Sequence, residues 1–157
     1  MWYRLANPDY RVIYPDSDDD EDNSDQINQG NDIFKENDIR IDSTKNINHL
    51  AIENGVVIGA LASGWTRHDN EMVFAFDLVV KQEFRIKGVG LQLIQNAIKQ
   101  YNQEKSDYKE MGHSTKMRIY VVNPLLFPVL ERLGFKVVET YQWNGSTYGV
   151  AYFEFYN

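Results

Sequence analysis

The chain has 157 residues, which suits a single domain with its own core, and it lacks cysteine, which excludes disulfides, thiolate metal sites and cysteine nucleophiles. Its formal net charge is -7, but the segment Asp16–Asp25 carries seven of the 23 acidic residues, so the other 16 balance the 16 Lys and Arg. No run of about 18 apolar residues occurs and Met1–Arg4 does not begin a signal peptide, so we expect a cytoplasmic protein without a membrane partner.

The amino-terminal part of the chain, residues 1–45, has few regular patterns. Aromatic and aliphatic residues between Met1 and Tyr14 predict an edge strand. Asp16–Asp25 predicts a solvated acidic loop, and its charge argues against nucleic acid as a partner. The polar stretch Gln26–Ser43 supports at most one short helix.

Strand patterns begin after residue 45. The apolar runs Ile47–Glu53 and Val56–Trp65 flank Asn54-Gly55, the strongest short signal for a hairpin. A loop is expected at Thr66–Asn70. Met72–Val80 then alternates little between polar and apolar residues, which predicts a central strand buried on both faces.

A helix is predicted after Gly88. Its apolar row consists of Val89, Leu93, Ala97 and Tyr101. After a loop at Ser106–Ser114, the alternation of Met117, Ile119 and Val121 predicts a strand. This strand must run parallel to Met72–Val80 because a helix joins the two.

The carboxyl-terminal part predicts a helix and a hairpin. Asn123-Pro124 resembles an N-cap and first-turn pair, although Pro128 leaves open that the helix begins there or bends. The runs Phe135–Trp143 and Tyr148–Tyr156 flank Asn144-Gly145, a second hairpin signal.

The link between the predicted central strand and the helix has the features of an anion site. Gly88 and Gly90 open the helix, where backbone N-H groups gather at the positive end of the helix dipole. A side chain at either position would hold a phosphate away from the backbone. G-x-G-x-x-G fails because Leu93 takes the third glycine's place, and no P-loop motif occurs. The alternative is an ordinary strand-to-helix turn without a ligand.

Arg85, Gly88 and Gly90 form the pattern Arg-x-x-Gly-x-Gly directly after a strand. This pattern resembles the acetyl-CoA signature of the GNAT superfamily of N-acetyltransferases. Leu78-Val79-Val80 stands where that family has a Leu-Ala-Val strand, and Phe84 fills its usual aromatic position before the arginine. Farther on, Asn123 and then Leu133-Gly134-Phe135 match the family's second landmark.

The resemblance implies a fold. We expect a mixed α/β (α+β) domain, with a mostly antiparallel sheet, a splayed central pair of parallel strands and flanking helices. One domain would cover residues 1–157, with a divergent part at 1–45 and a core at 46–157 that holds the acetyl-CoA site. Most of the superfamily has two helices where Gln26–Ser43 supports one, so the acceptor side departs from the family pattern.

The resemblance also implies acetyl-CoA as a cosubstrate. Main-chain groups of the strand end would pair with the pantetheine amides, and N-H groups of the turn would hold the diphosphate. The cofactor-binding residues implied in this way are Leu78, Val79, Val80, Arg85, Ile86, Lys87, Gly88, Val89, Gly90 and Asn123. For Arg85 and Lys87, a solvated surface pair is the alternative.

The catalytic residues are less defined. An amine with a pKa of about 10.4 must lose a proton, at a cost of about 4.6 kcal/mol at pH 7, so a base would help. Asp77 is the candidate base, with a structural carboxylate as the alternative. Where much of the family has a tyrosine acid, four residues before the Gly-Phe pair, this chain has Leu130. Tyr120 could substitute, or could be a packed strand residue.

Other chemistries find little support. His49, His68 and His113 lie far apart, without metal-ligand spacing. An EF-hand counted from Asp16 would need Gly and Glu where Glu21 and Ile27 stand. No G-x-S-x-G marks a serine hydrolase. We therefore expect no metal.

The function expected from the sequence is acetyl-CoA-dependent N-acetylation of a primary amine, on a small molecule or a peptide, by a monomer or homodimer. The alternative is a catalytically reduced GNAT-like module that binds CoA or a protein partner. Leu130 and the reduced amino-terminal region favour this alternative.

Overall fold

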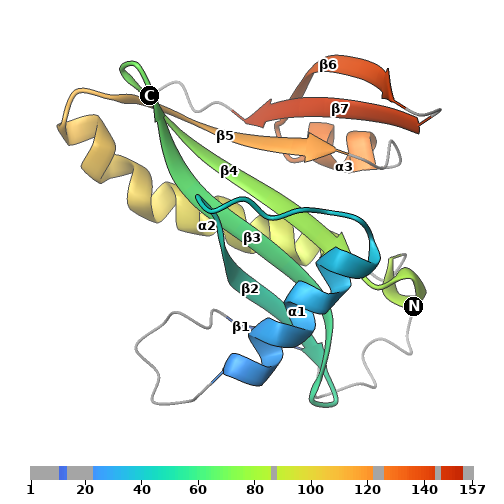
Figure 1. Cartoon of the computed structure of the whole chain (residues 1–157). Helices are drawn as coiled ribbons and strands as arrows, with labels where there is room; N and C mark the ends of the chain where they lie inside the picture. The colour runs from blue at the N-terminus through green and yellow to red at the C-terminus, as the bar shows by residue number, and fades with distance from the viewer. Residues whose placement is uncertain (1–10, 14–22, 86–87, 122–125, 144–145, 154–157) are drawn as a thin grey trace. The chain divides into compact units, whose positions relative to one another are not determined.

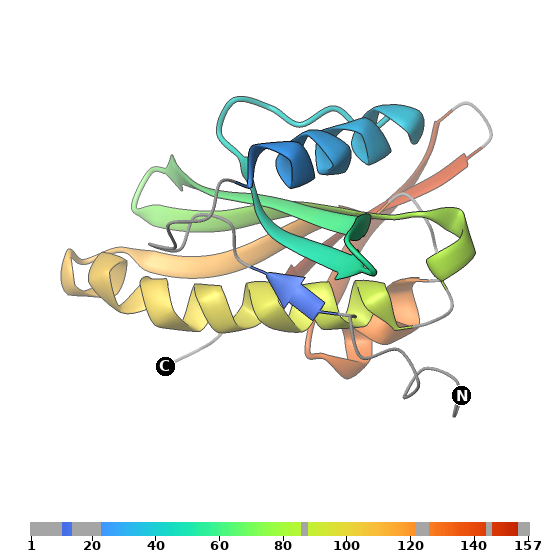
Figure 2. The same cartoon turned by 90° about the horizontal axis from the view of Figure 1, so that it is seen from below.

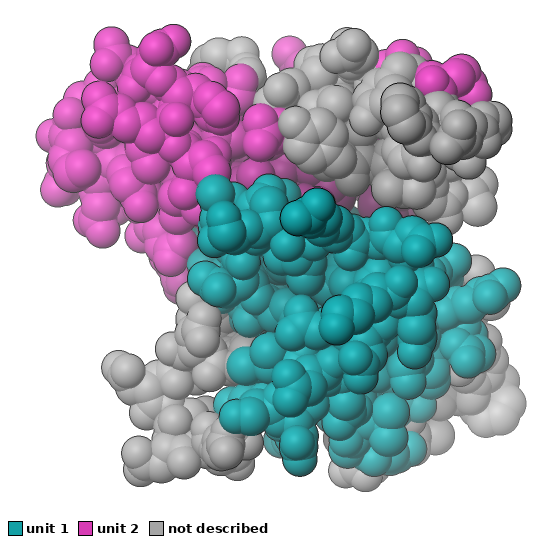
Figure 3. All heavy atoms as spheres, viewed as in Figure 1, with its two compact units in different colours: residues 1–63, 78–100 teal, residues 64–77, 101–157 magenta. Residues whose placement is uncertain are grey.

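The computed structural model describes residues 11–13, 23–85, 88–121, 126–143 and 146–153. The chain divides into two compact units (Figure 3). Unit 1 comprises residues 1–63 and 78–100, and unit 2 comprises residues 64–77 and 101–157. The expectation of one domain over residues 1–157 stays a prediction.

Figure 1 shows the order of the elements along the chain. They are β1 (Arg11–Ile13), α1 (Ser24–Glu36), β2 (Asn46–Glu53), β3 (Val56–His68), β4 (Glu71–Val80), a 3₁₀ turn (Gln82–Phe84), α2 (Val89–Glu110), β5 (Ser114–Val121), α3 (Phe127–Arg132), β6 (Lys136–Trp143) and β7 (Ser146–Phe153). The described strands form a sheet in the order β1-β2-β3-β4-β5-β7-β6. Among the described helices, none is long and apolar enough to cross a lipid bilayer.

The strands β4 and β5 form the parallel pair that the sequence predicts. Their register runs from Glu71↔Ser114 to Phe76↔Ile119, and β4 continues for the four residues Asp77 to Val80 beyond it. The neighbouring pairs β1-β2, β2-β3, β5-β7 and β6-β7 are antiparallel. The mixed sheet with a central parallel pair and flanking helices is therefore confirmed.

The hairpin between β2 and β3 is also confirmed. Asn54 and Gly55 both have positive φ, at 52° and 78°, which a two-residue turn of this kind requires. The predicted loop at Thr66–Asn70 is wrong at its start, because β3 continues to His68. The turn itself falls at Asp69, whose φ is 55°.

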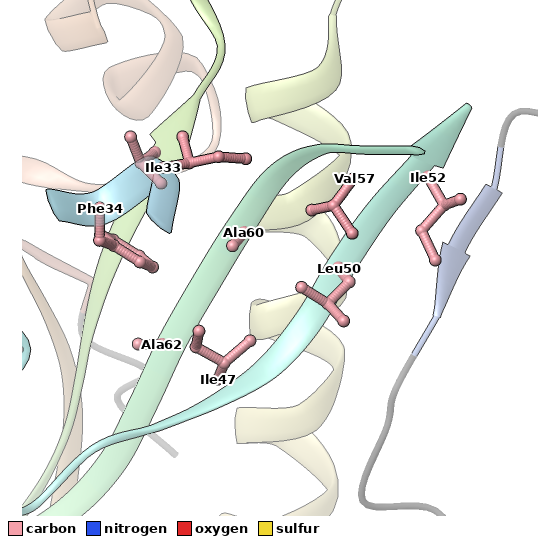
Figure 4. Packing of buried hydrophobic residues seen from close by; sticks show 9 residues of the cluster. Ile33, Phe34, Ile47, Leu50, Ile52, Val57, Ala60 and Ala62 are labelled. Carbon is pink, nitrogen blue, oxygen red and sulfur yellow. The ribbon is translucent and has the colours of Figure 1, made fainter. Parts of the chain in front are cut away.

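In unit 1, helix α1 packs on one face of β2 and β3. Ile33 and Phe34 of the helix are almost fully buried and belong to the same cluster as Leu50 (Figure 4). Gly30 allows the close approach, since a methyl group there would lie 3.0 Å from Leu50 Cδ2 and 3.2 Å from Ala60 Cβ. The helix α1 has 13 residues, and it begins at Ser24, so the predicted acidic loop Asp16–Asp25 is wrong at its end. The rest of α1 lies in Gln26–Ser43, where at most one short helix was predicted.

The beginning of α2 packs on the opposite face of β3. Successive residues of a strand point to opposite faces, so Gly59 and Ala60 face different helices. A methyl group on Gly59 would lie 3.2 Å from both Val89 Cγ1 and Leu93 Cδ1 of α2. Figure 2 shows α1 and α2 on the two sides of β3.

The predicted apolar row of α2 is confirmed, because its four members are at most 2% exposed. The predicted loop at Ser106–Ser114 is wrong in extent, since α2 continues to Glu110. Residues 106–110 are polar but contain neither Gly nor Pro, so nothing ends the helix before Gly112, whose φ is 87°.

An aromatic cluster organises the core of unit 2. Trp65 stacks on Tyr101 at 5.6 Å between ring centroids and meets Phe74 edge-on at 5.2 Å. Its indole N-H donates to Glu104 at 3.0 Å. The Tyr101 hydroxyl shares a hydrogen bond of 2.8 Å with Thr115 of β5, so the carboxyl-terminal half of α2 is fixed to the sheet of this unit.

The helix α3 begins at Phe127, with Leu126 as its N-cap and Pro128 in its first turn, which agrees with the alternative start near Pro128. The start predicted at Asn123-Pro124 lies outside the described residues. A proline in the first turn removes only an N-H that the helix does not use. The final hairpin is confirmed by the β6-β7 register, which includes Tyr141↔Tyr148.

Candidate functional site

The candidate site lies in unit 1, where β4 ends and α2 begins. Val79 and Val80 are buried near the end of β4, and Leu78 is half-buried. The N-H of Lys81 donates to the carbonyl of Ile58 on β3 at 2.8 Å. Because main-chain groups alternate along a strand, those of Leu78 and Val80 point away from β3. These main-chain groups at the end of β4 are therefore not used by β3.

The tip of α2 is capped by Gly88. Its carbonyl accepts a hydrogen bond from the N-H of Gln92 at 3.1 Å, the first bond of the helix ladder. Its φ is 78°, a left-handed conformation that glycine adopts without strain. The N-H groups of Val89, Gly90 and Leu91 occupy the first turn, which has no acceptors in its own helix. The positive end of a 22-residue helix therefore faces the turn after β4.

Among the residues that the structure describes, the neighbours of Gly90 do not require a glycine there. A methyl group at this position would lie 3.6 Å from Leu78 Cδ2 and 3.8 Å from Val80 Cγ2, which are ordinary contacts. Packing therefore explains Gly59, which is crowded, but it does not explain Gly90. A glycine without a packing reason at the tip of a helix fits a site where a ligand approaches the backbone closely.

Arg85 is exposed but held in place by two hydrogen bonds. Its Nε donates to the carbonyl of Val80 at 3.0 Å, and its Nη2 donates to Asn37 Oδ1 at 2.6 Å. Sequence patterns did not indicate Asn37, because the contact joins residues 48 positions apart. The only local signal is that asparagine is frequent at helix ends.

Residues 1–116 match the model of the Acetyltransferase (GNAT) family. The chain belongs to the GNAT acetyltransferase family. No curated protein matches the chain significantly.

Solved structures support the same fold for this GNAT protein. The structure of yncA, a putative acetyltransferase from Salmonella typhimurium with its cofactor acetyl-CoA, has a TM-score of 0.62 at 16% identity and covers 93% of this chain and 94% of its own. Escherichia coli ElaA has a TM-score of 0.63 at 16% identity, with 90% and 97% covered. A GNAT acetyltransferase from Streptococcus pneumoniae has a TM-score of 0.61 at 11% identity, with 91% and 97% covered.

The two catalytic candidates of this GNAT protein occupy equivalent positions on neighbouring strands of unit 2. Asp77 and Tyr120 each follow the last parallel pair, Phe76↔Ile119. The Asp77 side chain is half-buried, and the backbone of Tyr120 pairs with Val150 of β7. Each thus lies one residue beyond the paired part of β4 and β5, and their catalytic roles stay predictions.

Three other predicted site residues lie outside the described residues. These are Ile86, Lys87 and Asn123. Leu130 is fully buried in α3. It therefore contributes to the core of unit 2 as an aliphatic side chain.

Proposed function

We propose that this GNAT protein is an acetyl-CoA-dependent N-acetyltransferase that acts on a primary amine of a small molecule or peptide. The observation that carries the proposal is the glycine-capped tip of α2 directly after β4. Gly88 has a left-handed conformation there, and Gly90 leaves space that packing does not require. An anionic ligand fits such a tip, because the first-turn N-H groups and the helix dipole both favour negative charge.

The described residues fit the diphosphate of acetyl-CoA at this tip. The N-H groups of Val89, Gly90 and Leu91 would hold its oxygen atoms, and Arg85 would add positive charge. The pantetheine amides would pair with main-chain groups of Leu78 and Val80 that point away from β3. The carbonyl of Val80 already accepts a hydrogen bond from Arg85, so the Leu78 carbonyl is the more open acceptor.

The transfer of the acetyl group needs few catalytic side chains. Acetyl-CoA supplies an activated acetyl thioester, and the amine must reach it in its neutral form. Freeing the amine costs about 4.6 kcal/mol at pH 7, and Asp77 would accept that proton or orient the amine. Tyr120, at the equivalent position of β5, would donate a proton to the leaving group. A thiol of pKa about 8.5 leaves without much help, so this donor is not essential.

The test is thiol release from acetyl-CoA across a panel of amines. The control variants are Gly90→Glu, which brings bulk and negative charge to the helix tip, and Gln95→Glu, which adds the same charge at an exposed position farther along α2. We expect amine-dependent release by the wild type and Gln95→Glu, and loss of release in Gly90→Glu. Release that is equal in all three proteins would contradict the proposal.

The buried Leu130 favours a second function, a GNAT protein that binds CoA without turnover. A general acid typically contributes about 10²- to 10⁴-fold to rate, so its replacement can leave a slow enzyme or none. Tight CoA binding without thiol release for any amine would support this second function. Whether either form is a monomer or a homodimer stays a prediction.

A further inference from the structure

The guanidinium of Arg85 has a fixed orientation although the residue is exposed. Its Nε donates to Val80 at the end of β4, and its Nη2 donates to Asn37 at the end of α1. Among the described residues, none forms a hydrogen bond or ion pair with Nη1. A guanidinium carries five N-H groups in a planar fork, so the two that Nη1 bears stay available to a ligand.

The amide of Asn37 is itself oriented by α1. Its Nδ2 donates to the carbonyl of Ile33, one turn earlier, at 2.8 Å. Its backbone N-H also bonds to the last turn of the helix, with Ile33 and Phe34 carbonyls at 3.2 Å. Since Nδ2 can only donate and Oδ1 can only accept, Oδ1 must face Arg85. The end of the helix thus determines where the Asn37 acceptor lies.

The guanidinium of Arg85 is preorganised for binding a ligand. An exposed arginine normally samples many rotamers, and it loses that freedom when it binds a ligand. Two hydrogen bonds that already fix the guanidinium remove most of this loss before the ligand arrives. A planar guanidinium whose Nη1 has both N-H groups available suits the oxygen atoms of a phosphate.

We propose that Asn37 is a positioning residue that orients Arg85 toward the diphosphate of the acyl donor. This inference rests on the proposed function, because it assumes that the tip of α2 binds that diphosphate. It adds a residue from α1, a segment outside the glycine motif, to the determinants of acyl-donor affinity. The competing explanation is structural: the pair would only tie the end of α1 to the turn after β4.

Binding of CoA by single and double variants separates the two explanations. Calorimetry would give the Kd for CoA of wild type, Asn37→Ala, Arg85→Ala and the double variant. Removing a hydrogen bond to a charged group should raise the Kd roughly tenfold in Asn37→Ala, and at least as much in Arg85→Ala. If Asn37 acts through Arg85, the double variant binds CoA no more weakly than Arg85→Ala.

The chain offers a control for the loss of a side-chain amide bond to the carbonyl four residues earlier. Asn96 Nδ2 donates to the carbonyl of Gln92, also one turn earlier, at 2.9 Å. Asn96→Ala therefore removes the same kind of bond without affecting Arg85. We expect its Kd for CoA to equal that of the wild type.

Each outcome decides between the explanations. If Asn37→Ala weakens CoA binding equally in the wild-type and the Arg85→Ala backgrounds, the role is structural and the inference is wrong. If the wild type binds CoA and Asn37→Ala binds it equally well, the inference about Asn37 is wrong while the proposed function stands. If the wild type does not bind CoA, both the proposed function and the inference about Asn37 are wrong.

Discussion

Gly59 of β3 and Val89 of α2 meet so closely that a methyl group on Gly59 would lie 3.2 Å from Val89 Cγ1. The same methyl group would lie 3.2 Å from the carbonyl oxygen of Val79 on β4. Three elements of unit 1 therefore converge on one glycine. This contact fixes the first turn of α2 beside the end of β4, the two elements that form the candidate site.

Gly59→Ala should destabilise the protein and weaken acyl-donor binding together. Overpacking a tight core typically costs about 1 to 3 kcal/mol, and the relief available here is a shift of the helix tip. Urea titration followed by circular dichroism measures the first effect, and calorimetry with CoA measures the second. Val56→Ala, at an exposed position of the same strand, is the control and should change stability by less than about 0.5 kcal/mol. Unchanged stability of Gly59→Ala would show that the structure accommodates a methyl group at this position, which would contradict the prediction.

Gly88 should tolerate asparagine better than alanine. Its φ of 78° lies in the left-handed region, where a Cβ costs about 1 to 2 kcal/mol. Asparagine enters this region more readily than alanine. The unfolding free energy should therefore fall in the order wild type, Gly88→Asn, Gly88→Ala. An alanine variant as stable as the wild type would contradict the conformation assigned to this turn.

The stability of the protein should depend on pH through His49. This side chain on β2 is 4% exposed, and burial lowers its pKa from 6.5 to about 4. Above pH 6.5 the histidine is neutral in both the folded and the unfolded states. As the pH falls toward 4, the unfolded chain takes up a proton that the folded protein does not, so stability falls, by about 3 kcal/mol in total.

Unfolding free energies at several pH values between 7 and 4 measure this effect. His49→Leu should flatten the profile over this window, whereas His68→Gln, at an exposed position, should leave it unchanged. A profile for His49→Leu as steep as that of the wild type would show that other groups cause the pH dependence.

Sequence patterns predicted most of the regular structure because these elements follow local rules. Asn54-Gly55 has the backbone conformation that its turn demands, and the apolar row from Val89 to Tyr101 is buried. The glycine motif also predicted where α2 begins. In each case the deciding residues lie within a few positions of one another.

The features that the sequence did not reveal depend on tertiary contacts. Gly30 and Gly59 are isolated glycines. Atoms of residues from distant segments lie so close to them that a side chain at either position would be crowded. The contact of Asn37 with Arg85 is also not local. The ends of β3 and α2 were predicted too early because their last residues are polar, whereas polarity alone ends neither a strand nor a helix.

Leu130→Tyr should not restore a general acid. The side chain of Leu130 is fully buried in α3, so a larger tyrosine has no room and must place its hydroxyl in the core. We expect the unfolding free energy to fall by about 1 to 3 kcal/mol and the rate of thiol release not to rise. A tenfold or greater rise in rate would show that this position reaches the leaving group.

The central claim is that the tip of α2 binds the diphosphate of acetyl-CoA. Gly90→Glu tests it most directly, because a Cβ at this position makes only ordinary contacts and an acidic residue stabilises the first turn of a helix. Gly90→Gln, with nearly the same shape and no charge, separates bulk from repulsion.

The deciding measurement is the Kd for CoA of the wild type and Gly90→Glu, taken with their unfolding free energies. We expect at least a hundredfold weaker binding in Gly90→Glu, with stability within about 1 kcal/mol of the wild type. Equal CoA affinity in the two folded proteins would contradict the central claim.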